Sequence, residues 1–130
     1  MGKVRILTTG GTIAMRETRP GEGAVPTLSG MDLRGLLPPG LPPVEVEEVC
    51  NLPGAHMTLD LMWKIRSRAL AAVQEADVDG VVITHGTDTL EETAFLLDLS
   101  IPGDKAIVVT GAMRTSSDPG YEGQANLAAA

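Results

Sequence analysis

Three glycine-containing segments of this sequence carry the hydroxyl and carboxylate groups that could do chemistry. Each segment follows a run of apolar residues and combines Gly with Thr or Asp. Glycine lets backbone N–H groups approach a ligand closely, while the short side chains beside it can bind the ligand or attack it. The three segments are Thr9–Thr12, Thr84–Thr89 and Thr110–Arg114.

Two threonines are candidate nucleophiles. A threonine hydroxyl can attack a carbonyl carbon if a base removes its proton and if positioned donors stabilise the oxyanion that forms. Thr12 follows Gly11 and Thr87 follows Gly86, so that a hydroxyl and a backbone N–H could serve one site. Asp88 could hold a substrate ammonium group or orient its neighbours through a charge-assisted hydrogen bond.

The same residues also have structural interpretations. Asp88 and Thr89 each precede a glutamate by three residues, which is the spacing of a helix capping box. A lone threonine such as Thr12 more often hydrogen-bonds to the backbone of its loop than acts as a nucleophile. His85 ends an apolar run and is more often a structural histidine than a base. Because capping and catalysis are compatible, both interpretations stay open.

Nucleotide, metal and membrane sites are not indicated. The glycines match neither G-x-G-x-x-G nor the P-loop pattern. Cys50 is the only cysteine and has no Cys or His cluster around it, so we expect no metal ligands, no internal disulfide and a cytoplasmic location. No apolar run approaches the roughly 20 residues of a membrane-spanning helix.

The composition indicates an acidic globular domain. Ten Lys and Arg stand against seventeen Asp and Glu, a net charge of −7, which argues against nucleic acid as a partner. Hydrophobic residues make up 43% and charged residues 21%, which is the range of a folded chain. The length fits one domain.

The elements that must position the candidate site follow from periodicity. Residues 80–84 and 106–110 are almost wholly apolar, as in strands buried on both faces of a parallel sheet. Val44–Glu47 alternates apolar and acidic residues, which predicts a strand at a sheet edge. Further elements are expected as a strand at Val4–Leu7 and helices at Met31–Leu37, Thr58–Ala76 (capped by Thr58) and Leu90–Leu99.

This order predicts an α/β fold with a doubly wound, mostly parallel sheet and flanking helices. Ligands of such sheets bind at the carboxyl ends of the strands, so the three glycine-containing segments should meet at one edge. Arg16–Gly30 is polar and rich in Gly and Pro, which predicts a long loop.

Two motifs resemble the signatures of the bacterial-type L-asparaginases. Thr8–Ala14 is similar to the first signature and Ile83–Ala94 to the second, and Gly111–Arg114 matches in order and spacing. The resemblance covers nearly the whole chain. Members of this family are much longer and have a smaller C-terminal domain, so the resemblance implies that residues 1–130 are an incomplete N-terminal asparaginase-type α/β domain.

The resemblance implies an amidohydrolase that converts L-asparagine to L-aspartate and ammonia without a metal or organic cofactor. Thr12 would be the nucleophile that forms a β-aspartyl ester. Thr87 and Asp88 would form the second catalytic and substrate-binding cluster, with Gly11 and Gly86 beside the substrate. The family assembles as tetramers of intimate dimers, which implies a homo-oligomer for the full-length protein.

Several departures from the family pattern keep alternatives open. The residue matching Thr87 works with a later lysine in the family, and no lysine follows Lys105 here. The mobile-loop tyrosine of the family has no counterpart, because the only tyrosine is Tyr121. Asn51–Thr58 aligns with the loop that holds the substrate carboxylate in the family. Gly54 and Ala55 stand there where many relatives have a hydroxyl or amide side chain, which leaves glutamine open as a substrate. The alternatives are the asparaginase-like subunit of a tRNA-dependent amidotransferase and a non-catalytic amino-acid sensor.

Overall fold

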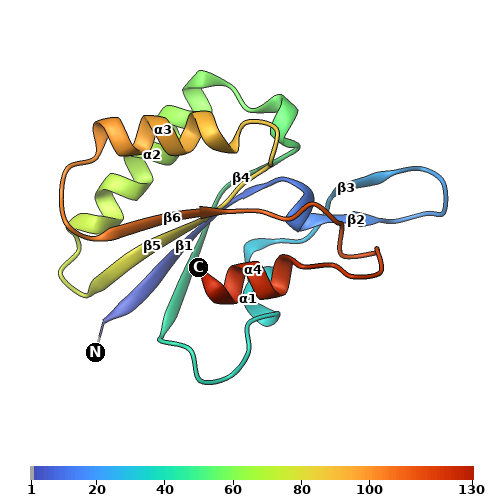
Figure 1. The fold of residues 1–130 in the computed structure, drawn as a ribbon, viewed down its shortest axis with the longest axis horizontal. Coiled ribbons are helices and arrows are strands. Elements are labelled where there is room, and N and C mark those ends of the chain that lie inside the picture. Colours follow the sequence, from blue (N-terminus) through green and yellow to red (C-terminus); the bar gives the residue numbers. More distant parts are fainter. Residues whose placement is uncertain (1) are drawn as a thin grey trace.

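The computed structural model describes residues 2–130 and has a parallel sheet at its centre (Figure 1). The strand order is β4-β1-β5-β6, and every neighbouring pair is parallel. From β1 the chain first runs to β4 on one side of β1. It then crosses to β5 on the other side of β1 and continues outward to β6, so the order in which strands are added reverses between β1 and β5. The strands are β1 (Lys3–Gly10), β4 (Val44–Leu52), β5 (Val78–Thr84) and β6 (Ala106–Thr110).

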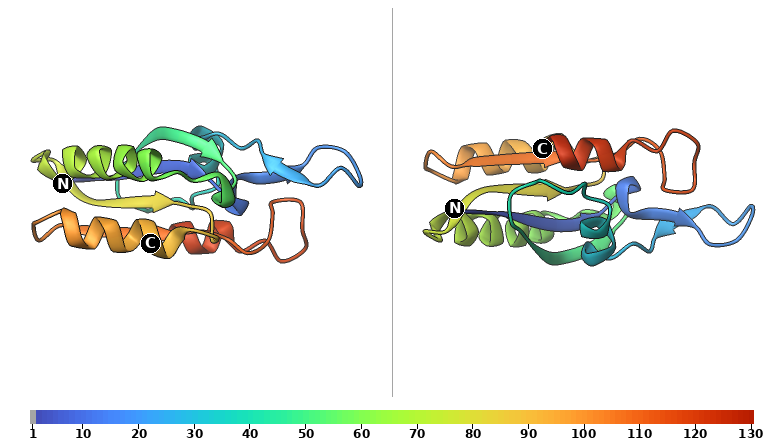
Figure 2. Two further views of the ribbon diagram at one scale, coloured as in Figure 1. Left: turned by 90° about the horizontal axis from the view of Figure 1, so that it is seen from above. Right: turned by 90° about the horizontal axis from the view of Figure 1, so that it is seen from below.

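Helices cover both faces of the sheet, which confirms the predicted doubly wound α/β fold. One pair of helices lies above the sheet in Figure 1 and the other pair below it, and Figure 2 shows each side in turn. The upper pair is α2 (Leu59–Gln74) and α3 (Leu90–Ser100), and the lower pair is α1 (Gly30–Gly35) and α4 (Gly123–Ala129).

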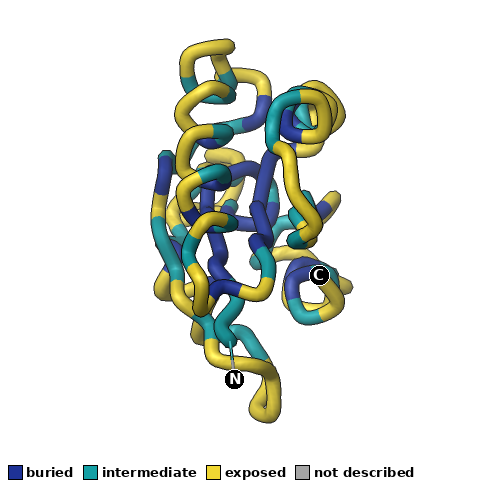
Figure 3. The backbone as a smooth tube through the Cα atoms, turned by 90° about the vertical axis from the view of Figure 1, so that its left-hand side faces the viewer, coloured by how far each residue is buried: buried dark blue, intermediate teal, exposed yellow. Residues whose placement is uncertain are grey.

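Alternate residues of the central strands enter two separate cores. Ile6 of β1 and Val82 of β5 belong to the core on the side of α1 and α4. Leu7, Val81 and Ile83 belong to the core under α2 and α3. Figure 3 shows the buried backbone in the middle of the molecule between these layers. The central strands are therefore apolar on both faces, as their sequences predict.

The helix starts confirm one capping prediction and correct another. Thr58 caps α2, because its hydroxyl accepts a hydrogen bond from the N–H of Leu61 at 3.3 Å. At the start of α3, Thr89 makes no side-chain capping bond. Its hydroxyl donates to the carbonyl of Gly54 at 3.0 Å instead. The capping-box interpretation of residues 88–92 is therefore wrong, because that hydroxyl ties the turn before α3 to the 3₁₀ turn η2 (Gly54–His56), which follows β4.

A β-hairpin stands in place of the long loop predicted at Arg16–Gly30. Its antiparallel strands are β2 (Met15–Glu17) and β3 (Ala24–Pro26), and it extends away from the central sheet (Figure 1). The Glu17 carboxylate accepts the N–H of Gly21 at 2.7 Å inside the turn. Most of the hairpin is exposed, so no apolar alternation marks it in the sequence.

The position of β4 in the sheet also agrees with the sequence. β4 lies at one edge of the sheet, as the alternation of apolar and acidic residues predicts. Within residues 2–130, no helix combines the length and the apolar character needed to cross a bilayer.

Candidate active site

The turns that follow the strands meet at the carboxyl edge of the sheet. The N–H of Gly11, just after β1, donates to the carbonyl of Leu52 at the end of β4 at 2.7 Å. The N–H of His85, just after β5, donates to the carbonyl of Thr110 at the end of β6 at 2.8 Å. These bonds continue the sheet beyond its last ladder pairs. The three glycine-containing segments therefore lie along one edge, as predicted.

Glycine backbones cross in direct contact at the centre of this edge. Gly11 has a φ of +77°, and a β-carbon on it would lie 2.5 Å from the Cα and N atoms of Gly86. A β-carbon on Gly86 would overlap the backbone of Gly54, which leads out of β4. Only glycine permits so close an approach. The crossing brings the residues that follow, Thr12 and Thr87, to the same part of the edge.

Thr12 begins a short 3₁₀ turn, η1 (Thr12–Ala14), and is partly buried. The next residue, Ile13, is fully buried, and its carbonyl accepts the hydroxyl of Tyr121 at 2.7 Å. Tyr121 therefore braces the turn that carries Thr12. The sequence does not predict this contact, because 108 residues separate Tyr121 from Ile13 and no local pattern links them.

The side chains of Thr87 and Asp88 are exposed and make no hydrogen bond or ion pair with any residue in the range 2–130. The Cβ of Asp88 lies 3.3 Å from where a β-carbon on Gly54 would stand. Thr87 lines an open hollow of about 360 Å³ together with Gly111 and Glu122. Both side chains are thus available to a ligand. No hydrogen bond joins the hydroxyls of Thr12 and Thr87 in this part of the chain.

His85 lies beneath the turn that carries Thr87. It is fully buried, and its two ring nitrogens each lie 2.8 Å from an oxygen atom, that of the Gly86 carbonyl and that of the Thr93 hydroxyl. Burial lowers the pKa of His85 and outweighs the raising effects of the Gly86 carbonyl and of Glu92. The prediction of a structural histidine is confirmed.

The arrangement suits acyl transfer at an amide carbonyl. It offers a partly buried hydroxyl on Thr12 and an exposed hydroxyl and carboxylate on Thr87 and Asp88. The backbone N–H groups of Thr12 and Thr87 have no acceptor within the described range, so they could bind an oxyanion. Residues 2–130 hold no cluster of three or more His, Cys, Asp or Glu side chains placed to bind a metal ion.

Comparisons with known proteins agree with the motifs. Residues 3–130 match the family model described as Asparaginase, N-terminal. An L-asparaginase of Bacillus licheniformis is 39% identical over 127 residues, which cover 96% of this chain and 39% of that protein. A subunit of the glutamyl-tRNA(Gln) amidotransferase of Methanopyrus kandleri is 36% identical over 137 residues, which cover 98% of this chain and 29% of that protein.

A solved structure has the same fold. The crystal structure of a probable cytoplasmic L-asparaginase from Campylobacter jejuni superposes with a TM-score of 0.85 at 34% identity. The match covers 98% of this chain and 38% of that protein. The chain therefore spans less than half the length of each of these relatives.

Proposed function

The chain belongs to the asparaginase family, whose N-terminal model it matches almost from end to end, and on this premise we propose that the protein hydrolyses the side-chain amide of L-asparagine. The products are L-aspartate and ammonia. The observation that carries the proposal is the contact between Gly11 and Gly86, because it gathers Thr12, Thr87 and Asp88 at one edge of the sheet.

In the proposed reaction Thr12 is the nucleophile. Its Oγ forms a bond to the amide carbon while its proton passes through a base to the departing nitrogen. The C–N bond then breaks, ammonia leaves and a β-aspartyl ester remains on Thr12. Water hydrolyses this ester, returns a proton to Thr12 and releases L-aspartate. The backbone N–H groups of Thr12 and Thr87 face the oxyanion of each tetrahedral intermediate.

The second cluster, Thr87 and Asp88, binds the substrate and assists the proton transfers. The Thr87 hydroxyl takes part in the proton transfers, and the Asp88 carboxylate holds the α-ammonium group of the substrate through a charge-assisted hydrogen bond. Gly11 and Gly86 lie beside the substrate, and a side chain on either would meet the backbone of the neighbouring turn and push the two turns apart. Both Thr87 and Asp88 are free for these roles because neither caps α3.

The lysine that would work with Thr87 is not supplied by the lysines of this chain. Lys64 donates to the carbonyl of Val49 at 2.9 Å, and Lys105 donates to the carbonyl of Glu75 at 2.6 Å, at the opposite end of the sheet. Lys3 lies at that end too. We therefore assign residues 1–130 to an incomplete N-terminal domain and expect the lysine and a smaller C-terminal domain beyond Ala130. We also propose that the full-length protein is cytoplasmic and forms a homo-oligomer, either a dimer or a tetramer.

Ammonia release by the complete gene product tests this function. L-Asparagine should be hydrolysed by the unaltered protein, and Thr12→Ala and Thr87→Ala should each lower kcat by at least about 100-fold. Ser67→Ala removes a hydroxyl from the exposed face of α2 and serves as the matched control. Undiminished hydrolysis by a folded Thr12→Ala variant would refute the assignment of the nucleophile.

A second candidate is the asparaginase-like subunit of a tRNA-dependent amidotransferase, which the similarity to the Methanopyrus protein favours. The same assay with L-glutamine, with and without glutamyl-tRNA and a partner subunit, separates the two. Stimulation of glutamine hydrolysis by these partners supports the second candidate. Calorimetric binding of L-asparagine without any ammonia release would instead indicate an amino-acid sensor.

A further inference from the structure

His85 has no step of its own in the proposed reaction, yet it is fully buried against the turn that carries Thr87. Its Nδ1 lies 2.8 Å from the carbonyl oxygen of Gly86. Its Nε2 lies 2.8 Å from the hydroxyl of Thr93, which is itself fully buried in α3. Both ring nitrogens are thus used, and the ring connects the turn to the helix that follows it.

The hydrogen-bond partners determine which nitrogen carries the proton. A carbonyl oxygen only accepts, so Nδ1 must be the donor to Gly86. Because burial lowers the pKa of His85, the ring is neutral near pH 7 and Nε2 carries a lone pair. The Thr93 hydroxyl therefore donates to Nε2. Thr93 in this way fixes the tautomer that Gly86 requires.

The planarity of the peptide bond extends this contact to the substrate side. The peptide between Gly86 and Thr87 is trans, so its C=O and N–H point in opposite directions. With the carbonyl held inward by His85, the N–H of Thr87 points to the exposed side of the turn, where it has no acceptor among residues 2–130.

The orientation of the Gly86–Thr87 peptide has to be fixed by a hydrogen bond. Gly86 must be glycine because of its contact with Gly54, and glycine lets the adjoining peptide rotate at little steric cost. A flipped peptide would aim the carbonyl of Gly86 at the place where the substrate oxygen gains negative charge, and it would bury the N–H of Thr87. The hydrogen bond from His85 to Gly86 opposes that flip.

We propose that His85 is a positioning residue that holds the Gly86–Thr87 peptide with its N–H toward the substrate, with Thr93 orienting the imidazole ring. The inference rests on the proposed amidohydrolase function. The effect concerns an N–H that binds the oxyanion, so its loss lowers kcat and leaves KM little changed.

A pair of amide substitutions in the complete gene product separates this role from packing. In His85→Asn, the amide N–H stands near the position of Nδ1–H and keeps the bond to Gly86. In His85→Gln, the longer amide reaches the position of Nε2, so the bond to Thr93 is kept and the bond to Gly86 is lost. Both variants replace the ring by a smaller amide, which makes each a control for the other.

We expect His85→Gln to lower kcat for L-asparagine by about 100-fold, with KM changed less than about threefold. His85→Asn should keep kcat within about fivefold of the unaltered protein. Equal losses in the two variants, or losses in both kcat and KM that follow thermal stability, would overturn the proposal. Should both variants fail to fold, Thr93→Val against Thr93→Ser gives the same contrast, because only serine keeps the hydroxyl that fixes the ring.

The tautomer gives a readout that needs no activity. Long-range ¹H–¹⁵N correlation spectra of the unaltered protein should show His85 neutral and protonated at Nδ1 at pH 7. An Nε2-protonated or charged ring would overturn the positioning role alone. Failure of the unaltered protein to release ammonia from either amide would refute the proposed function, while the spectrum would still report the state of His85.

Discussion

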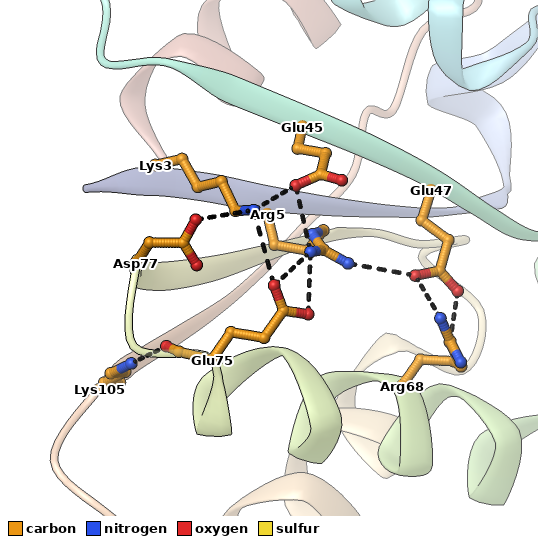
Figure 4. Close-up of polar contacts among 8 residues, drawn as sticks. All are labelled: Lys3, Arg5, Glu45, Glu47, Arg68, Glu75, Asp77 and Lys105. Carbon is orange, nitrogen blue, oxygen red and sulfur yellow. Dashed lines mark hydrogen bonds and ion pairs between the residues drawn. The ribbon is translucent and has the colours of Figure 1, made fainter. Parts of the chain in front are cut away.

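The two ends of the central sheet differ in whether their polar side chains are paired with one another. At the amino end, Lys3 and Arg5 of β1 lie among carboxylates from β4 and from the turn before β5 (Figure 4). The Arg5 side chain is only 10% exposed, and its Nη2 atom lies 2.8 Å from one carboxylate. Lys3 Nζ lies 2.7 Å from another. The carboxylates that pair with these two cations are Glu45, Glu47, Glu75 and Asp77.

At the carboxyl end, the polar groups that carry the candidate site lack partners within residues 2–130. The side chains of Thr87 and Asp88 are exposed, and the backbone N–H groups of Thr12 and Thr87 have no acceptor there. Contacts between glycine backbones and the hydrogen bonds of the buried His85 hold the turns of this end together. At the amino end, ion pairs have that role. The charged side chains of the amino end therefore pair with one another and stabilise the fold, whereas Thr87 and Asp88 at the carboxyl end stay exposed and unpaired within residues 2–130.

The largest effect should come from Gly86→Ala. The new methyl group would overlap the backbone of Gly54, so the two turns must separate. We expect the free energy of unfolding to fall by about 3 kcal/mol and kcat for L-asparagine to fall by at least about 100-fold. Denaturant titration and ammonia release measure the two quantities.

Gly35→Ala in α1 is the matched control. A β-carbon at Gly35 has no atom within 4 Å, and alanine is the better helix former by up to about 1 kcal/mol. This variant should be as stable as the unaltered protein or slightly more so. An equally stable and active Gly86→Ala variant would show that the carboxyl end tolerates separation of its turns.

Asp88→Asn should affect activity without affecting stability. The carboxylate makes no ion pair in the described part of the chain, so the free energy of unfolding should change by less than about 0.5 kcal/mol. Loss of the charge opposite the substrate ammonium should raise KM by about 30-fold. Asp98→Asn, the same change on the exposed face of α3, should alter neither quantity. A large loss of stability in Asp88→Asn would contradict the contrast between the two ends.

The sequence was sufficient for the parts of the fold that depend on local pattern. The apolar run at 80–84 predicts a buried parallel strand because both faces of such a strand are covered, and residues 81–84 of β5 are buried. The run at 106–110 does form a parallel strand, but the prediction that it is buried is wrong, because β6 lies at an edge of the sheet and its residues are exposed or only partly buried. The acidic alternation at Val44–Glu47 predicts an edge strand because one face meets water. The meeting of the three glycine-containing segments follows from the rule for open parallel sheets. The catalytic roles of Thr12, Thr87 and Asp88 stay predictions.

Features that join distant residues could not be predicted in this way. The bond from Tyr121 to Ile13 and the ion pair from Arg5 to Glu75 join residues 108 and 70 positions apart, and nothing in the local sequence marks either. The spacing of Thr89 suits a capping box, but its hydroxyl is used by the carbonyl of Gly54. The exposed hairpin strands lack the apolar alternation on which strand prediction depends.

Arg5→Met should reduce stability and leave catalysis unchanged. The substitution leaves neighbouring carboxylates without the buried guanidinium that separates them, and we expect a loss of about 2 kcal/mol in the free energy of unfolding. The kcat value should not change, because the cluster lies at the end of the sheet opposite the site. Arg19→Met removes an exposed arginine from its pair with Glu22 in the hairpin and should have no measurable effect on stability. A fall in kcat of folded Arg5→Met would show that the two ends are coupled.

The smallest effect should appear in the acid dependence of stability. Hydrogen bonds from Lys3 hold the pKa of Glu45 and of Asp77 below their ordinary values of 4.5 and 3.8. Folded carboxylates with lowered pKa bind protons less readily than unfolded ones, so their contribution is complete above the ordinary values and is lost as the pH falls through the folded ones. The unfolding midpoint should therefore fall more steeply between about pH 5 and pH 3 in the unaltered protein than in Lys3→Met.

Two comparisons make that measurement specific to the amino end. Lys3→Arg keeps the charge and should keep the steep acid slope. Because Glu45 and Asp77 are at least half exposed, about 1 M NaCl should screen their pairs with Lys3 and bring the slope of the unaltered protein toward that of Lys3→Met. Other carboxylates with lowered pKa, such as Asp32 and Asp118, contribute equally to all three proteins and cancel in the difference. Identical slopes in Lys3→Met and the unaltered protein at low salt would mean that the Lys3 pairs add nothing to stability, which would leave Arg5 alone to account for the stabilising role of the amino end.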